Sequence, residues 1–348
     1  MKLGIVSVQD AANCGAYLQG YALQKVLTDL GHDAGFVNRI NTGRIKNQFY
    51  RLISRKLITH PVKYVKDLSF GIRKYLAYRE AWEHLKYIDT DSADALVIGS
   101  DEIWNVEKNR YHDKKYFGDP DKKNIAYAPS CADCPFEVMD AMPHVKQALQ
   151  SFHRILVRDE NTRTNVGKLV GTPPPVVCDP TVLMDFDVTV SDKTAKALKE
   201  PYLLIYGYSR SQEEEIMLRA FAARHKLRIV SVNFNVKWAD VILTCSPLEF
   251  PGIVARADYV VTSSFHCSIF ALKHSRPLAV FPSGSKVTDM LRRYGAETCI
   301  ATGCTFEAFS DVLVNPQYDA EKVLAAMDED RQRSLSLLRE ALENQKHI

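Results

Sequence analysis

Short apolar runs of strand length alternate with helical segments along most of the chain, and this alternation most constrains the fold. The first unit has an apolar run at residues 2–8, helical spacing at 15–30 that Gly31 can close, and another run at 33–37. The alternation continues through further apolar runs at residues 94–98, 124–128, 154–157, 176–178, 202–206, 228–232, 241–244, 259–262 and 278–281. Strands separated by helices form parallel sheets. We therefore predict an α/β protein of two Rossmann-like domains.

The length of 348 residues is more than one hydrophobic core usually organises. We predict an N-terminal Rossmann-like domain at residues 1–185, a C-terminal one at 200–317, and a crossover near 180–200. The charged stretch at residues 318–348 reads as a closing helix that can pack back on the first domain.

A basic segment at residues 44–86 interrupts the first domain, with eleven Lys or Arg residues against three Asp or Glu. We favour a solvated helical insertion here. The alternative is a surface that attracts an anionic polymer or a membrane-bound lipid-linked sugar.

The sequence lacks the usual signatures of several functional classes of protein. The net charge of +3 is too small to indicate a nucleic-acid partner. No Gly-x-Gly-x-x-Gly follows the first strand and no phosphate-loop motif is present, which disfavours nicotinamide enzymes and P-loop NTPases. The Cys131–Cys134 pair has no further ligands at a matching spacing, so we expect no metal site.

The sequence shows neither a signal-peptide core nor an apolar stretch of the roughly 20 residues that cross a bilayer. We therefore expect a cytoplasmic protein, with peripheral association to the inner face of the membrane as an option. The eight cysteines are then expected to be reduced.

In the second half, an apolar strand runs into Ser263, Ser264 and His266 at the start of a helix. A helix N-terminus can hold a phosphate or carboxylate, and His266 can exchange a proton near neutral pH. Lys286 opens the next helix after the following strand, so the two cationic side chains can form an anion clamp. The alternative is a capping serine and a structural histidine.

In the first half, Asp101, Trp104 and Asn105 follow an apolar strand. A carboxylate and an indole face are typical of a sugar site, where they bind hydroxyl groups and stack on the ring. The alternative is that Asp101 caps a short helix and Trp104 packs inward. Arg158 follows another strand and can bind a carboxylate or phosphate through two hydrogen bonds, with neighbouring Asp159 as its alternative partner.

Six short elements occur in an order that resembles the polysaccharide pyruvyl transferase family, over roughly residues 1 to 300. They are Asn13-Cys-Gly-Ala-Tyr-Leu-Gln-Gly-Tyr-Ala-Leu-Gln24, Ile98-Gly-Ser-Asp-Glu-Ile-Trp-Asn105, Ala126-Tyr-Ala128, Val157-Arg-Asp-Glu160, Cys178-Asp-Pro-Thr181 and Ser264-Phe-His266. The resemblance implies a GT-B-like fold with an interdomain cleft that binds phosphoenolpyruvate and an acceptor sugar, without metal or nucleotide. It assigns functional roles to Arg158, His266 and Lys286.

These expectations give a hypothesis for the reaction. Arg158 and Lys286 would bind phosphoenolpyruvate, and His266 would donate a proton or bind the phosphate. We predict that His266 and Asp101 are the catalytic residues. Asp101 or Asn13 would orient the acceptor, a saccharide or lipid-linked saccharide of a surface polymer. One departure is Ala16, where many members carry an acidic residue. A nucleotide-sugar glycosyltransferase of the GT-B type and a non-catalytic saccharide-binding protein are the alternatives, and the oligomeric state stays open.

Overall fold

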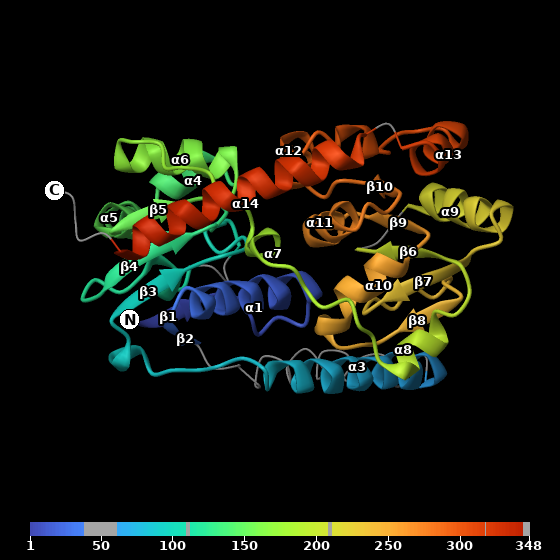
Figure 1. Cartoon of the computed structure of the whole chain (residues 1–348), viewed down its shortest axis with the longest axis horizontal. Helices are drawn as coiled ribbons and strands as arrows, with labels where there is room; N and C mark the ends of the chain where they lie inside the picture. Colours follow the sequence, from blue (N-terminus) through green and yellow to red (C-terminus); the bar gives the residue numbers. More distant parts are fainter. Residues whose placement is uncertain (38–60, 109–111, 208–210, 317, 344–348) are drawn as a thin grey trace.

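Two parallel sheets of five strands each lie side by side in the computed structural model, which describes residues 1–37, 61–108, 112–207, 211–316 and 318–343 (Figure 1). The strand orders are β2-β1-β3-β4-β5 and β10-β9-β6-β7-β8. The strands are β1 (Lys2–Val6), β2 (Asp33–Phe36), β3 (Ala95–Ile98), β4 (Lys123–Tyr127), β5 (Arg154–Leu156), β6 (Tyr202–Tyr206), β7 (Arg228–Val232), β8 (Val241–Leu243), β9 (Tyr259–Thr262) and β10 (Leu278–Val280). The prediction of two Rossmann-like α/β units is confirmed.

The central strands are buried on both faces because helices cover both sides of each sheet. This explains why they appear in the sequence as continuous apolar runs. One predicted strand, at residues 176–178, is wrong: within the described chain only Val176 forms an isolated bridge, to Val157. The chain leaves the sheet here because Asp179 caps the next helix and Pro180 begins it.

The helices have local sequence signals at their ends. Asn13 caps the first long helix, Asp159 caps another, and Gly171 ends that one in the left-handed conformation. The α-helices are α1 (Cys14–Asp29), α3 (Pro61–Trp82), α4 (Phe136–Asp140), α5 (Pro143–Ser151), α6 (Glu160–Val170), α7 (Pro180–Leu183), α8 (Asp192–Ala197), α9 (Gln212–Arg224), α10 (Phe250–Arg256), α11 (Phe265–Lys273), α12 (Ser285–Arg293), α13 (Phe306–Val314) and α14 (Ala320–Glu343). Short 3₁₀ turns are η1 (Thr90–Ser92), η3 (Lys114–Phe117), η4 (Pro247–Glu249) and η5 (Glu297–Cys299).

The last helix, α14, connects the two halves. It packs against α11 of the second half and against β4 and β5 of the first, and Figure 1 shows it crossing above both sheets. The Ser334 hydroxyl accepts a hydrogen bond from the Cys178 backbone N–H at 2.9 Å, and Asp330 pairs with Arg293. The predicted domain boundaries near residues 185 and 200 remain a proposal, with α7 and α8 in the connecting region.

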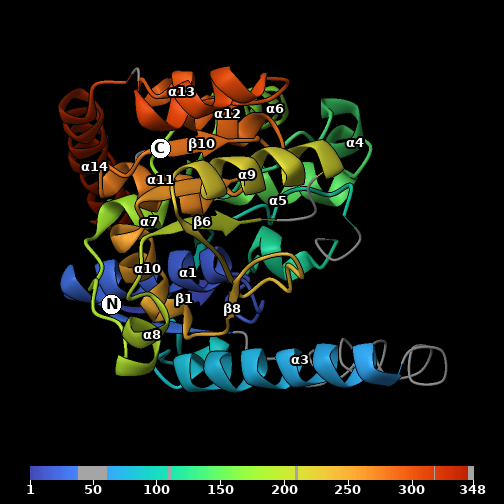
Figure 2. The same ribbon diagram turned by 90° about the vertical axis from the view of Figure 1, so that its right-hand side faces the viewer.

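The basic segment contributes α3, which lies along the lower edge of the molecule in Figure 2, opposite α12 and α13. The part of that predicted insertion at residues 44–60 lies outside the described residues. Lys74 of α3 reaches the second half, where its ammonium donates to the Asn233 carbonyl at 3.0 Å. The segment therefore contacts both halves.

In each sheet the strand order reverses beside the first strand, between β1 and β3 and between β6 and β9. The carboxyl ends of parallel strands at such reversals are where α/β proteins bind ligands. The turns after β1, β3 and β9 therefore define the region in which the functional groups should be sought.

We predict that Ser334→Ala lowers stability by about 1–3 kcal/mol, because it leaves the buried Cys178 N–H without an acceptor. Ser336→Ala, two residues along the same helix on an exposed position, should have little effect. Thermal melts of both variants would check this. Equal melting temperatures for the two variants would contradict it.

Candidate active site between the two halves

A buried carboxylate, Asp179, brings together groups from different parts of the chain. Its Oδ2 accepts a hydrogen bond from Arg158 Nη1 at 3.0 Å and lies 3.5 Å from His266 Nε2. Asp179 precedes α7, Arg158 follows β5, and His266 lies in the first turn of α11. The sequence predicted roles for Arg158 and His266, and the structure places both beside one oxygen atom.

The charges around Asp179 determine its ionisation. Burial would raise its pKa, but the His266 imidazole and the Arg158 guanidinium hold the pKa of this carboxyl well below its usual range. Asp179 is therefore ionised at neutral pH. Its contribution to stability is complete above the usual aspartate range and is lost only as the pH falls through the lowered value.

Arg158 is buried and only partly paired. Its Nη2 lies 3.9 Å from Asp101 Oδ1, and its Cζ lies 4.7 Å from the ring centre of Phe265. The Nε and Nη2 groups donate no hydrogen bond to any described residue. Buried guanidinium N–H groups normally have acceptors. A carboxylate or phosphate oxygen is the acceptor that fits them best.

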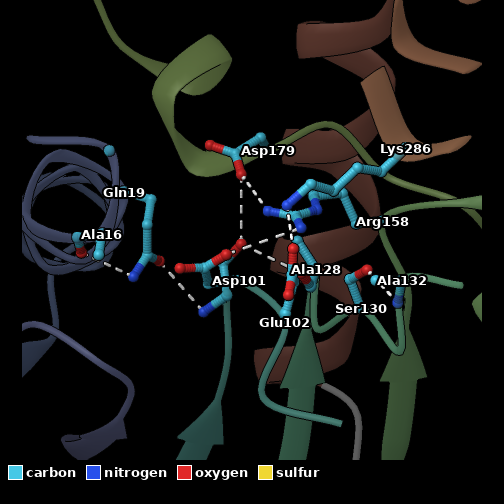
Figure 3. Close-up of polar contacts among 12 residues, drawn as sticks. Ala16, Gln19, Asp101, Glu102, Ala128, Ser130, Ala132, Arg158, Asp179 and Lys286 are labelled. Carbon is cyan, nitrogen blue, oxygen red and sulfur yellow. Dashed lines mark hydrogen bonds and ion pairs between the residues drawn. The ribbon is translucent and has the colours of Figure 1, made fainter. Parts of the chain in front are cut away.

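Asp101 was predicted to be catalytic, and it lies beside this arginine (Figure 3). Its backbone adopts a φ of 77°, in the left-handed region that few residues other than glycine occupy. The Ser130 N–H donates to its carbonyl at 2.9 Å, which fixes the turn after β3 to the loop after β4. The side chain is 18% exposed, so one carboxylate oxygen can reach a ligand.

His266 lies where the first helix of the chain meets the second half. A Cβ atom on Gly15 would lie 2.1 Å from Nδ1 of His266, so only glycine fits at this position of α1. Asn13, the residue that precedes α1, accepts hydrogen bonds through Oδ1 from the N–H groups of Gly15 and Ala16. Its oxygen caps α1, and its predicted contact with substrate remains a prediction.

Lys286 is paired across the interface between the two halves. Its ammonium forms an ion pair with Glu102, which also pairs with Lys108. Burial would raise the pKa of Glu102, yet the two lysines lower it to about 2. The interface therefore keeps this ion pair at neutral pH and loses it as the pH falls toward that value.

The start of α12 also contacts a carboxylate of the first half. The Ser285 N–H donates to Asp133 Oδ1 at 3.2 Å, and a Cβ on Gly284 would lie 2.6 Å from the other Asp133 oxygen. Carboxylates of the first half thus contact two groups of the second half, the Lys286 ammonium and the N-terminus of α12. Both are groups that bind anions.

The predicted serines flank the start of α11. Ser264 is its N-cap residue but makes no side-chain capping hydrogen bond, and its carbonyl accepts from Ser268. Ser263 packs against Gly207, where a Cβ would lie 2.3 Å from the Ser263 hydroxyl oxygen. Both serines are half-buried, and their contact with substrate remains a prediction.

The prediction that Trp104 stacks on a sugar is wrong. Its side chain is fully buried, its Nε1 donates to the Tyr116 carbonyl at 2.8 Å, and its ring stacks on Phe117. The turn after Asp101 directs it into the core because aromatic partners lie there. Asn105 is also buried, and its role stays a prediction.

Sequence reasoning missed Asp179 and Glu102 as site residues, although both stand in motifs that it singled out. Asp-Pro-Thr is a recognisable helix start, since aspartate caps and proline suits the first turn. That signal predicts a cap and nothing more. No sequence pattern indicates that its second oxygen faces Arg158 and His266.

Comparisons with solved structures give the class of fold. The chain is similar to a putative UDP-N-acetylglucosamine 2-epimerase from Listeria monocytogenes (TM-score 0.56, 11% identity, 99% of this chain and 97% of that one). It is also similar to the UDP-GlcNAc 2-epimerase of Methanocaldococcus jannaschii (TM-score 0.54, 10% identity, 97% of this chain and 100% of that one). A third similar structure is the glycotransferase of kitacinnamycin (TM-score 0.51, 13% identity, 98% of this chain and 99% of that one). These likenesses, with the two sheets, show a GT-B fold.

The family follows from the sequence itself. The model of the polysaccharide pyruvyl transferase family matches residues 13–285, so the chain belongs to that family and is a transferase. No curated protein matches it closely enough to serve as a relative.

No helix within the described ranges combines the length and apolar character needed to cross a bilayer. Among the same residues, no three His, Cys, Asp or Glu side chains form a group that could hold a metal ion.

We predict that Gly15→Ala disturbs the site more than it disturbs the fold, because the new methyl group overlaps the His266 ring. Gly20→Ala is the matched control, since it adds the same methyl to α1 with its nearest neighbour at 3.2 Å. The measurement is turnover alongside thermal stability. If Gly15→Ala retained wild-type turnover, the tight packing on His266 would be without consequence.

Proposed function

We propose that this transferase takes the pyruvyl group from phosphoenolpyruvate and joins it as a ketal to two hydroxyl groups of a saccharide. The observation that carries the proposal is the buried Arg158, whose Nε and Nη2 donors have no acceptor among the described residues. Membership of the family supports the reaction class and a saccharide acceptor. The identity of the donor rests on the chemistry of the site.

Phosphoenolpyruvate carries a carboxylate and a phosphate, so it needs at least two cationic partners. Arg158 would bind one of these groups with its unpaired N–H groups, in the bidentate manner of guanidinium and carboxylate. Lys286 would bind the other, giving up or sharing its ion pair with Glu102. The uncapped start of α11 adds the positive end of a helix dipole.

The reaction needs a proton on the methylene carbon and two additions at the neighbouring carbon. His266 Nε2 faces the same Asp179 oxygen as Arg158, so it would protonate the methylene of a donor held by Arg158. The first acceptor hydroxyl adds to the resulting cationic carbon and loses its proton to Asp101. The second hydroxyl then adds as the bond to the phosphate oxygen breaks, and inorganic phosphate leaves with the second proton.

The two alternative functions, a glycosyltransferase and a saccharide-binding protein, can be distinguished from the proposed one by their products. A glycosyltransferase of this fold would turn over a nucleotide sugar, whereas a saccharide-binding protein would release nothing. Incubation with phosphoenolpyruvate and free or lipid-linked saccharides, followed by phosphate release and the mass of the sugar, separates them. Nucleotide-sugar turnover without phosphate release from phosphoenolpyruvate would overturn the proposal.

We predict that Arg158→Lys lowers kcat/KM by roughly 30- to 1,000-fold, since a lysine cannot reproduce two parallel hydrogen bonds to one anion. Phosphoenolpyruvate should raise the melting temperature of the wild type and raise it much less in this variant and in Lys286→Met. Arg163→Lys, an exposed arginine of α6, is the control and should match the wild type. Equal ligand-induced shifts in all four proteins would remove Arg158 and Lys286 from the donor site.

The peripheral membrane association expected for a lipid-linked acceptor has support from α3. Val65, Ile72 and Leu76 are exposed at 59%, 46% and 46%, and their spacing puts them on one helix face. Arg73 and Arg79 are exposed on the same helix. An apolar stripe flanked by basic residues is typical of helices that lie on anionic bilayers.

We predict that the protein co-sediments with phosphatidylglycerol vesicles more than with phosphatidylcholine vesicles. Replacing Ile72 and Leu76 together by Asp should abolish this difference, because it removes apolar contact and adds negative charge. Ile216→Asp, at an exposed apolar residue of α9, is the control. Equal sedimentation of all three proteins with both vesicle types would contradict the association.

A further inference from the structure

Asp179 is the most completely enclosed charged group of the site, and the proposed reaction gives it no role. Its side chain has no exposed surface. Its Oδ1 accepts from the Thr181 backbone N–H at 3.0 Å and from the Thr181 hydroxyl at 2.7 Å, as the cap of α7. The two oxygens therefore have separate tasks, and Oδ1 already has two donors.

The other oxygen faces the site. Asp179 Oδ2 receives Arg158 Nη1 at 3.0 Å and the Ser100 hydroxyl at 3.4 Å, and His266 Nε2 lies 3.5 Å away. Arg158 and Ser100 belong to the first half and His266 to the second. One carboxylate oxygen thus joins the donor-binding arginine to the proposed proton donor across the interface.

The carboxylate is held rigidly. Pro180 fixes the first turn of α7, and this short helix packs against α1, α11 and α14. A side chain fixed at Oδ1 by its own helix cannot turn away from the site without losing two hydrogen bonds. Its second oxygen is therefore a fixed reference point for the two cationic groups.

The charged groups around His266 come from three elements. Asp179 lies at the start of α7, Arg158 lies in the turn after β5, and Asp101, in the turn after β3, lies against that arginine. The first turn of α1 brings Cys14 and no acidic residue. With the arginine positive and both aspartates negative, a protonated His266 makes this cluster neutral, whereas a neutral one leaves a net negative charge.

We propose that Asp179 is a positioning residue for pyruvyl transfer: its Oδ2 aligns Arg158 with His266 and favours the protonated imidazole that delivers the proton. This role rests on the proposed function for its catalytic consequence. Before proton delivery, the carboxylate stabilises the imidazolium. The arginine, oriented by the same oxygen, keeps its Nε and Nη2 directed at the donor.

The test is Asp179→Asn, which keeps the shape and can still cap α7 through its oxygen while removing the charge. Loss of the carboxylate should lower kcat by roughly 100-fold or more and also raise the KM for phosphoenolpyruvate, because Arg158 loses the oxygen that orients it. The alkaline limb of the kcat profile should move to lower pH by about one unit or more, because the protonated histidine loses its anionic partner. A purely structural role would not move that limb.

Two comparisons separate positioning from stability. Asp330→Asn removes another buried aspartate that pairs with an arginine, Arg293, away from this cluster. It should lower the melting temperature and leave the pH profile unchanged. The double variant Asp179→Asn with His266→Gln should lose little more activity than His266→Gln alone, because residues that act as one unit are not additive.

A substrate-free readout keeps this inference distinct from the proposed function. In NMR titrations, the His266 imidazole signals, assigned with His266→Gln, should change at lower pH in Asp179→Asn than in the wild type. An unshifted NMR titration would overturn the inference whatever the reaction proves to be. A shifted titration in a protein that releases no phosphate from phosphoenolpyruvate would retain the pairing and reject the reaction.

Discussion

The hydrogen bond between the buried guanidinium of Arg158 and the buried carboxylate of Asp179 is the interaction on which the site depends. A charge in the interior is tolerated only with a partner, and breaking such a pair leaves an uncompensated charge. The two side chains come from the end of β5 and the start of α7. Their pairing therefore fixes how the last strand of the first sheet leads into the connection between the halves.

The two halves meet through small residues and opposite charges. Gly15 lets the first helix approach the His266 ring, and Glu102 pairs with Lys286 across the same interface. Asp133 occupies the start of α12. The carboxylates that hold the halves together thus lie on groups suited to bind an anionic donor. The proposed donor site and the interface contacts therefore share the same cationic group, Lys286.

Much of the fold could be predicted because strands buried on both faces read as apolar runs and helix ends carry their own caps. The predictions failed where a residue's neighbours come from distant segments. The run at residues 176–178 has strand character, but the α7 cap ends it. Trp104 has the chemistry of a sugar platform, but Tyr116 and Phe117 enclose it.

The sequence by itself determined the two parallel α/β units, the family, and the position of Arg158, His266 and Lys286 near strand ends or helix starts, because short-range periodicity and local motifs encode these features. Only the tertiary structure decided that Asp179 turns its second oxygen to Arg158 and His266, and that Lys286 pairs with Glu102. These contacts join residues from 21 to 184 positions apart. Their geometry depends on how the two sheets and their helices pack together, which no local pattern records.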